Sequence, residues 1–103
     1  MKSAEKIVPD FFSALGHISR IRIIEAMRDG ERCQCELPDL LGIEQSNLSR
    51  HIKILAASGA LRSRRDGTRM MLSVDPCIHD LVGTARELLR TRVRTQTAVL
   101  EQP

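Results

Sequence analysis

The segment from about residue 35 to residue 58 constrains the fold more than any other part of the chain. Its pattern predicts a short helix over residues 35–41, which Gly42 ends. A longer amphipathic helix follows, with apolar residues spaced to form one buried stripe: Leu48, Ile52 and Leu55. A short helix, a glycine turn and an amphipathic helix are typical of a helix-turn-helix, whose second helix enters the major groove of DNA.

The second helix of this unit has a polar and basic side opposite its apolar stripe. Ser46 is the expected N-cap, and Gly59 is placed to end the helix. Polar and arginine side chains on such a helix meet base edges or nearby phosphates. His51 is interpreted as a phosphate contact or, like His17 and His79, as a structural or surface residue. The predicted DNA contacts of this helix are Gln45, Ser46, Asn47, Ser49, Arg50, His51 and Lys53.

The period of the sequence pattern changes after the second helix. Two runs, at 61–65 and 68–74, are separated by Asp66-Gly67, which is a strong hairpin signal. A two-stranded ribbon directly after a recognition helix is a wing, predicted here over about residues 61–74. Its arginines are expected to contact phosphates or the minor groove, the simpler alternative being solubilising charge on a hairpin. They are Arg62, Arg64, Arg65 and Arg69.

Apolar residues at helical spacing predict two helices before the helix-turn-helix. The first covers about residues 4–15, with Pro9 in its first turn. The second covers about residues 18–28 and is closed by Gly30. The residues of the second helix expected to face inward are Ile21, Ile24 and Met27.

A last helix is predicted over about residues 76–97, with Asp75 as its cap and Pro76 in its first position. Its apolar stripe is longer than a body of this size covers: Ile78, Leu81, Val82, Ala85, Leu88, Leu89 and Val93. We therefore interpret this helix and the helix at 4–15 as dimerisation helices. The expected fold is mainly α with a β-hairpin wing, a single winged helix-turn-helix domain over residues 1–103 that forms a homodimer.

Charge and aromatic content favour double-stranded DNA as the partner. The formal net charge is +3, and residues 44–72 contain six basic side chains and two acidic ones. A basic stretch over a helix and a hairpin is expected in a protein that binds a polyphosphate backbone. Aromatic residues make up only 2% of the chain. This disfavours single-stranded nucleic acid, because stacking on bases needs aromatic side chains.

No secretory signal is expected at the amino terminus, where four charged residues interrupt the apolar pattern of residues 1–12. No apolar run approaches the roughly 20 residues that span a bilayer. We expect a soluble cytoplasmic protein without a membrane partner. In a reducing compartment, three cysteines favour free thiols or metal ligands over a disulfide framework.

Cys33 and Cys35 stand at the start of the helix-turn-helix. On an ideal helix, residues two apart point roughly 200° away from each other. Both thiols therefore reach one ion only if Cys33 lies before the helix, or if binding unwinds the first turn. Either way, the bound ion fixes a local geometry that competes with the geometry needed on DNA, as an inducer must. The helix amino terminus and Arg32 favour the thiolate form, which captures metal.

Four segments of the chain carry a family resemblance. They are ALGHISRIRII at 14–24, CQCEL at 33–37, LSRHIKIL at 48–55 and SGAL at 58–61. Together they resemble the ArsR/SmtB family of bacterial and archaeal metal-sensing repressors, over about residues 8–90. The thiol box, the segment CQCEL with Cys33 and Cys35, looks like that of arsenic- and cadmium-responsive members. The resemblance implies a dimeric winged-helix repressor that leaves its operator when an inducer binds.

The ligand set departs from the family pattern. Arsenic-responsive members often have a third cysteine where this chain has Pro38, and cadmium- or lead-responsive members often add amino-terminal cysteines, which residues 1–32 lack. The family's zinc site on the last helix is also missing, since only His79 lies there. A three-sulfur As(III) or Sb(III) site would take its third ligand from Cys77 of either subunit or from a small thiol. Cys77 is otherwise interpreted as a small apolar filler.

The sequence therefore predicts a dimeric winged-helix repressor that binds operator DNA and is induced by As(III) or Sb(III), with no organic cofactor. The alternatives on the same fold are a thiol-redox sensor and a sensor of Cd(II), Pb(II) or Zn(II). Four thiolates for Cd(II) or Zn(II) are not available within one subunit. A thiol enzyme is disfavoured, because the chain has no phosphate-binding loop, no nucleophile-and-base pair and no C-x-x-C motif.

Overall fold

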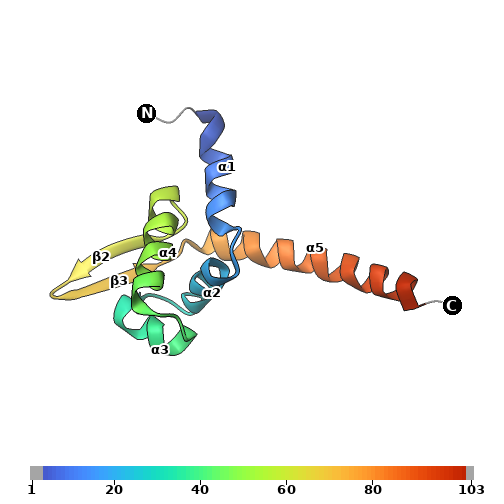
Figure 1. The fold of residues 1–103 in the computed structure, drawn as a ribbon. Helices are drawn as coiled ribbons and strands as arrows, with labels where there is room; N and C mark the ends of the chain where they lie inside the picture. The colour runs from blue at the N-terminus through green and yellow to red at the C-terminus, as the bar shows by residue number, and fades with distance from the viewer. Residues whose placement is uncertain (1–3, 102–103) are drawn as a thin grey trace.

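The structure is a computed structural model that describes residues 4–101 and the side chains of residues 4–92. The fold is mainly helical with an antiparallel β-hairpin, as the sequence predicted (Figure 1). The hairpin and the last helix project from opposite sides of a small helical body. In chain order the elements are α1 (Ala4–Leu15), α2 (Ile18–Ala26), β1 (Arg32–Cys33), the 3₁₀ turn η1 (Gln34–Glu36), α3 (Leu37–Leu41), α4 (Gln45–Ser58), β2 (Arg62–Asp66), β3 (Arg69–Ser73) and α5 (Pro76–Glu101).

The core forms where α2, α3, α4 and β3 meet. Ile24 and Met27 are buried as predicted, whereas Ile21 is only partly buried. The three residues of the α4 stripe are buried, and they pack with fully buried Leu37 and Leu72. Burying each such side chain stabilises the fold by about 1.5–3 kcal/mol. This core fixes α4 relative to the short helix before it and the wing after it.

The predicted N-cap of α4 is wrong. The helix begins at Gln45, and Glu44 occupies the N-cap in an extended conformation with φ −60° and ψ 141°. The Ser46 hydroxyl lies inside the first turn and donates a hydrogen bond to the Glu44 carboxylate at 2.7 Å. Ser46 is therefore exposed on the first turn of the helix, where its side chain is held by Glu44.

Two details of the first helices also differ from the prediction. Pro9 lies inside α1 rather than in its first turn. Proline removes one backbone hydrogen bond there, and α1 tolerates the loss because this stretch is exposed and the freed carbonyl can be hydrated. The second helix ends at Ala26 rather than near residue 28, because Met27 leaves the helical conformation with ψ 12°.

The wing is a three-stranded antiparallel sheet in the order β1-β3-β2. In the hairpin, Asp66 pairs with Arg69, so the turn is Gly67 and Thr68, one residue later than predicted. Gly67 has φ 64°, a conformation that glycine adopts without strain. The third strand, β1, was not predicted, and it pairs Cys33 with Met71. The first cysteine of the thiol box is therefore part of the wing sheet.

The last helix extends well beyond the body (Figure 1). It begins as predicted, with the Asp75 carboxylate accepting a hydrogen bond from the Cys77 backbone N–H at 2.8 Å. Large apolar side chains remain exposed on α1 and α5: Ile7, Val8, Phe12, Leu81, Leu88 and Leu89. Val93 of the predicted stripe lies outside the described side chains. Within residues 4–101, no helix is both long and apolar enough to cross a membrane.

Candidate functional site

The exposed surface of α4 carries most of the predicted DNA contacts. Five of these side chains are exposed to solvent: Gln45, Ser46, Asn47, Arg50 and Lys53. Ser49 is different, because it is partly buried and its hydroxyl oxygen accepts a hydrogen bond from the Gln34 side-chain amide at 3.5 Å. The structure thus places five of the seven predicted residues on the open surface of the helix.

His51 lies in a different setting from the other predicted contacts. Its ring packs against His17 with 4.6 Å between centroids, and its Nδ1 accepts a hydrogen bond from Arg20 Nε at 3.3 Å. Burial lowers the pKa of His51, and the charges of His17, Arg20 and Arg50 lower it further. The side chain therefore ties α4 to α2, and this position argues against the phosphate contact predicted for it.

The four wing arginines divide into two groups. Arg64 forms a two-pronged ion pair with Glu31, with distances of 2.8 and 2.5 Å. This pairing lowers the pKa of Glu31 and raises that of Arg64. Arg62 lies 3.7 Å from the Asp75 carboxylate. Arg65 and Arg69 make no ion pair with any residue in the described part of the chain, so their charge is available to an external anion.

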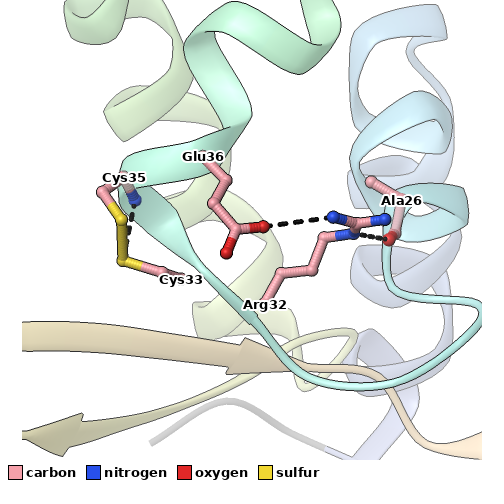
Figure 2. Close-up of polar contacts among 5 residues, drawn as sticks. All are labelled: Ala26, Arg32, Cys33, Cys35 and Glu36. Atoms are coloured by element: carbon pink, nitrogen blue, oxygen red, sulfur yellow. Dashed lines mark hydrogen bonds and ion pairs between the residues drawn. A yellow bond between two sulfur atoms is a disulfide. The ribbon is translucent and has the colours of Figure 1, made fainter.

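Cys33 and Cys35, the thiol pair, are joined by a disulfide (Figure 2). This corrects the expectation of free thiols. Cys33 lies in the extended strand β1, with φ −69° and ψ 134°, and its sulfur accepts a hydrogen bond from the Cys35 N–H at 3.2 Å. The first cysteine thus lies before the helix, which is one of the two arrangements predicted to bring both sulfurs together.

Arg32 holds the segment that carries the thiol pair. Its Nε donates to the Ala26 carbonyl at 2.7 Å, and its Nη1 forms an ion pair with Glu36 at 3.1 Å (Figure 2). The guanidinium therefore links the end of α2 to the 3₁₀ turn. Since Cys33 is also paired with Met71 across the sheet, the thiol pair is connected to α2 on one side and to the wing on the other.

A cleft of about 630 Å³ opens beside the thiol pair. We call it the thiol cleft. One wall is formed by residues 33–35 and Pro38, a second by Gln45 and Leu48 of α4, and the third by residues 68–70 of the wing. The space next to the sulfurs is therefore bounded by the two elements predicted to touch DNA. Sequence reasoning missed this cleft and the role of Gln34, because neither follows from local pattern.

Cys77 does not join the thiol pair in one subunit. It is a free, exposed cysteine in the first turn of α5. A hydrogen bond to the Asp75 carboxylate raises the pKa of its thiol, and the negative charges of Asp75 and Asp80 raise it further. Within the described residues, no three histidine, cysteine or acidic side chains are grouped so that they could hold a metal ion. The predicted three-sulfur set is therefore not assembled within a single chain.

Comparison with known proteins identifies the family. The family model described as "Bacterial regulatory protein, arsR family" matches residues 18–63. An HTH-type transcriptional regulator of Mycobacterium tuberculosis, Rv0081, is 38% identical over 93% of this chain and 86% of its own length. The crystal structure of Rv0081 superimposes with a TM-score of 0.82 at 33% identity, covering 94% of this chain and 99% of that chain.

One further relative and one structural neighbour extend the comparison. A probable mercury resistance operon repressor of Streptomyces lividans is 38% identical over 74% of this chain and 62% of its own length. The solution structure of a homodimeric winged helix-turn-helix DNA-binding domain from Mycobacterium bovis has a TM-score of 0.79 at 20% identity, covering 91% of this chain and 93% of that chain. The second likeness concerns the fold alone. With its recognition helix, its wing and these relatives, the chain belongs to the ArsR family of bacterial regulatory proteins and is a winged-helix transcriptional regulator.

Proposed function

We propose that this regulator is a repressor that binds operator DNA as a homodimer and is released when As(III) or Sb(III) binds Cys33 and Cys35. The observation that carries the proposal is the convergence of these two sulfurs at the base of the wing sheet, beside α4. The relatives are transcriptional regulators, which favours regulation over catalysis. The S. lividans relative is a probable mercury resistance repressor, and mercury is another thiophilic metal.

The thiol pair supplies two of the three ligands that a three-sulfur site needs. Cys33 and Cys35 supply two soft donors that already lie within bonding reach of each other. The third donor is Cys77 of the partner subunit or a small thiol, since Cys77 of the same chain is not grouped with the pair. A bound thiophile would supply strong bonds to sulfur, and the chain would supply the frame in which those bonds fix the backbone around η1.

The route from the sulfurs to DNA runs through two contacts. Cys33 pairs with Met71, so a change in β1 acts on the wing through the sheet. Gln34 lies between the two cysteines and bonds Ser49, so a change in η1 acts on α4 through that amide. An inducer shifts the equilibrium only by its differential affinity for the two states. A coupling of roughly 10- to 100-fold in operator affinity is enough for a switch.

The dimer is proposed to form through α1 and α5. Both helices leave large apolar side chains exposed, among them Phe12 and Leu88 at 53% and 56%. A large exposed apolar patch on a soluble protein marks a surface that binds a partner. The M. bovis neighbour of the same fold is homodimeric.

The proposal is tested with a DNA duplex that the reduced protein itself selects from a random-sequence pool. Fluorescence anisotropy of the complex is followed during titration with arsenite or antimonite under a strong non-thiol reductant. We expect release at inducer amounts close to one per subunit. Retention of the complex at saturating arsenite, with direct proof that the arsenite is bound, would overturn the proposal.

Thiol oxidation is a second candidate trigger, and the Cys33–Cys35 disulfide favours it. Oxidation replaces two thiols by one bond at the position where an inducer would bind. The same duplex separates the two triggers. Release by arsenite under reductant supports the inducer, and release only when the protein is oxidised without arsenite supports the redox trigger.

A further inference from the structure

The two sulfurs of the thiol pair are unequally accessible. Cys35 is exposed in the 3₁₀ turn, whereas Cys33 is only 2% exposed because its strand packs against β3. Both residues line the thiol cleft. A reagent that enters the cleft from solvent therefore reaches Cys35 first, and Cys33 stands behind it within bonding reach.

The charge of the cleft selects the kind of reagent. Arg69 is the charged residue among those that line it. Within the described residues Arg69 forms no ion pair, although Asp66 lies opposite it across the hairpin. Gln45 adds an exposed amide to the same cleft. A volume of about 630 Å³ lies within the range of small-molecule sites, roughly 300–1,000 Å³. A small anion suits this lining.

We propose that the thiol cleft receives a small anionic disulfide, with which the thiol pair exchanges in a fixed order, Cys35 first and Cys33 second. The Cys35 thiolate attacks one sulfur of the bound disulfide, which breaks the small disulfide, forms a mixed disulfide and releases one small thiolate. The Cys33 thiolate then attacks the Cys35 sulfur, which releases the second small thiolate and leaves the Cys33–Cys35 bond.

The reaction balances in electrons and protons. The thiol pair loses two electrons, the small disulfide gains two, and the two thiol protons leave with the released small thiols at neutral pH. The inference deepens the oxidation candidate above by naming its oxidant class and the order of its sulfurs. It also places the exchanging molecule between Gln45 and the wing, the two elements that a bound DNA would contact.

The order of attack is tested by trapping. Reduced full-length protein is mixed with oxidised glutathione, quenched with acid and mapped by mass spectrometry. In Cys33→Ser/Cys77→Ser we expect a stable mixed disulfide on Cys35. In Cys35→Ser/Cys77→Ser the adduct on Cys33 should form more slowly, by at least about tenfold, because access controls exchange. In Cys77→Ser, which keeps the pair intact, early quenching should show the transient adduct on Cys35.

The charge of the cleft is tested with probes of different sign. Oxidised glutathione is anionic, 2-hydroxyethyl disulfide is neutral and cystamine is cationic. We expect Arg69→Gln to reduce the preference for glutathione over the neutral probe by about fivefold, equivalent to about 1 kcal/mol for one solvent-exposed charge contact. Arg65→Gln is the matched control. It removes an arginine from the same hairpin that does not line the cleft, and it should leave the preference unchanged.

Three results would overturn the inference. The first is a mixed disulfide that forms on Cys33 before Cys35. The second is an equal effect of Arg69→Gln and Arg65→Gln on the preference for glutathione, and the third is an equal exchange rate with all three probes. Because the exchange is measured without DNA, its failure leaves the arsenite-release experiment standing. Failure of arsenite release likewise leaves the exchange chemistry standing.

Discussion

At the scale of single residues, Asp75 sets the properties of the first turn of α5. Its carboxylate accepts the Cys77 N–H, and this bond lowers the pKa of Asp75. The same carboxylate raises the pKa of the Cys77 thiol. Cys77 is therefore exposed and yet held mainly as the protonated thiol near neutral pH, which disfavours it as a spontaneous nucleophile.

Asp75→Asn should accelerate alkylation of Cys77. In a Cys33→Ser/Cys35→Ser background, we expect the iodoacetamide rate at pH 8 to rise severalfold, because removing the Asp75 charge lowers the pKa of the thiol and so increases its thiolate fraction. The amide oxygen can still cap the helix. Asp80→Asn is the control, because Asp80 contributes less to the shift. Equal acceleration by both variants would show that Asp75 has no special role.

The residue scale is also where sequence reasoning was weakest. The exposed side of α4 follows from the spacing of its apolar residues, and the two cysteines were singled out by their resemblance to the family's thiol motif. The neutralisation of Arg64 does not follow from spacing, because its partner Glu31 is 33 positions away. The anchoring of His51 does not either, because Arg20 lies 31 positions earlier. Both interactions form only when the chain has folded, so no local sequence pattern predicts them.

At the scale of elements, Gly59 ends the recognition helix in a left-handed conformation. Its φ is 86°, and a Cβ placed there would meet no atom within 4 Å. Gly59→Ala should therefore destabilise the protein through backbone strain alone, by about 1–2 kcal/mol. Gly83→Ala is the control, because Gly83 lies in α5 with an ordinary helical φ, and a Cβ placed there meets no atom of the same subunit within 4 Å. This control should gain up to about 1 kcal/mol. Urea unfolding measures the stability of both variants. An equal loss of stability in the two would contradict the role of the left-handed conformation of Gly59.

The contact between α2 and α4 should make stability depend on pH. The pKa of His51 is lowered from its ordinary value of 6.5 in the folded protein. The unfolded chain therefore takes up a proton before the folded chain does, and the free energy of unfolding falls as pH drops below 6.5. His51→Gln should flatten this dependence between pH 7 and about pH 5. Unfolding curves at several pH values check this, and identical pH slopes in both proteins would contradict it.

Helices and the hairpin were predictable because their signals are local. Apolar spacing, glycine ends and the Asp75-Pro76 start place five helices and two strands within a few residues of their observed bounds. Strand β1 was not predicted, because two residues are too few to show the alternating apolar pattern of a strand. Only their pairing with β3 makes them a strand. That strand is what connects the thiol pair to the wing.

At the scale of the whole molecule, DNA affinity should depend on salt through the unpaired basic residues. Arg65→Ala should lower the slope of log affinity against log salt by about one per subunit in contact. Arg64→Ala should change the slope less, because Glu31 already neutralises this arginine. Binding titrations over a range of salt concentrations measure both slopes. A larger change in slope for Arg64→Ala than for Arg65→Ala would contradict the expectation that Arg65, and not Arg64, contacts DNA.

The inducer role of the thiol pair is tested by comparing the wild-type protein with Cys33→Ser/Cys35→Ser on the selected duplex, under reductant, with and without arsenite. We predict that both proteins bind DNA without arsenite, and that arsenite weakens wild-type binding about 10- to 100-fold while leaving the double variant bound. If arsenite releases the double variant as readily as the wild type, the thiol pair is not the inducer site.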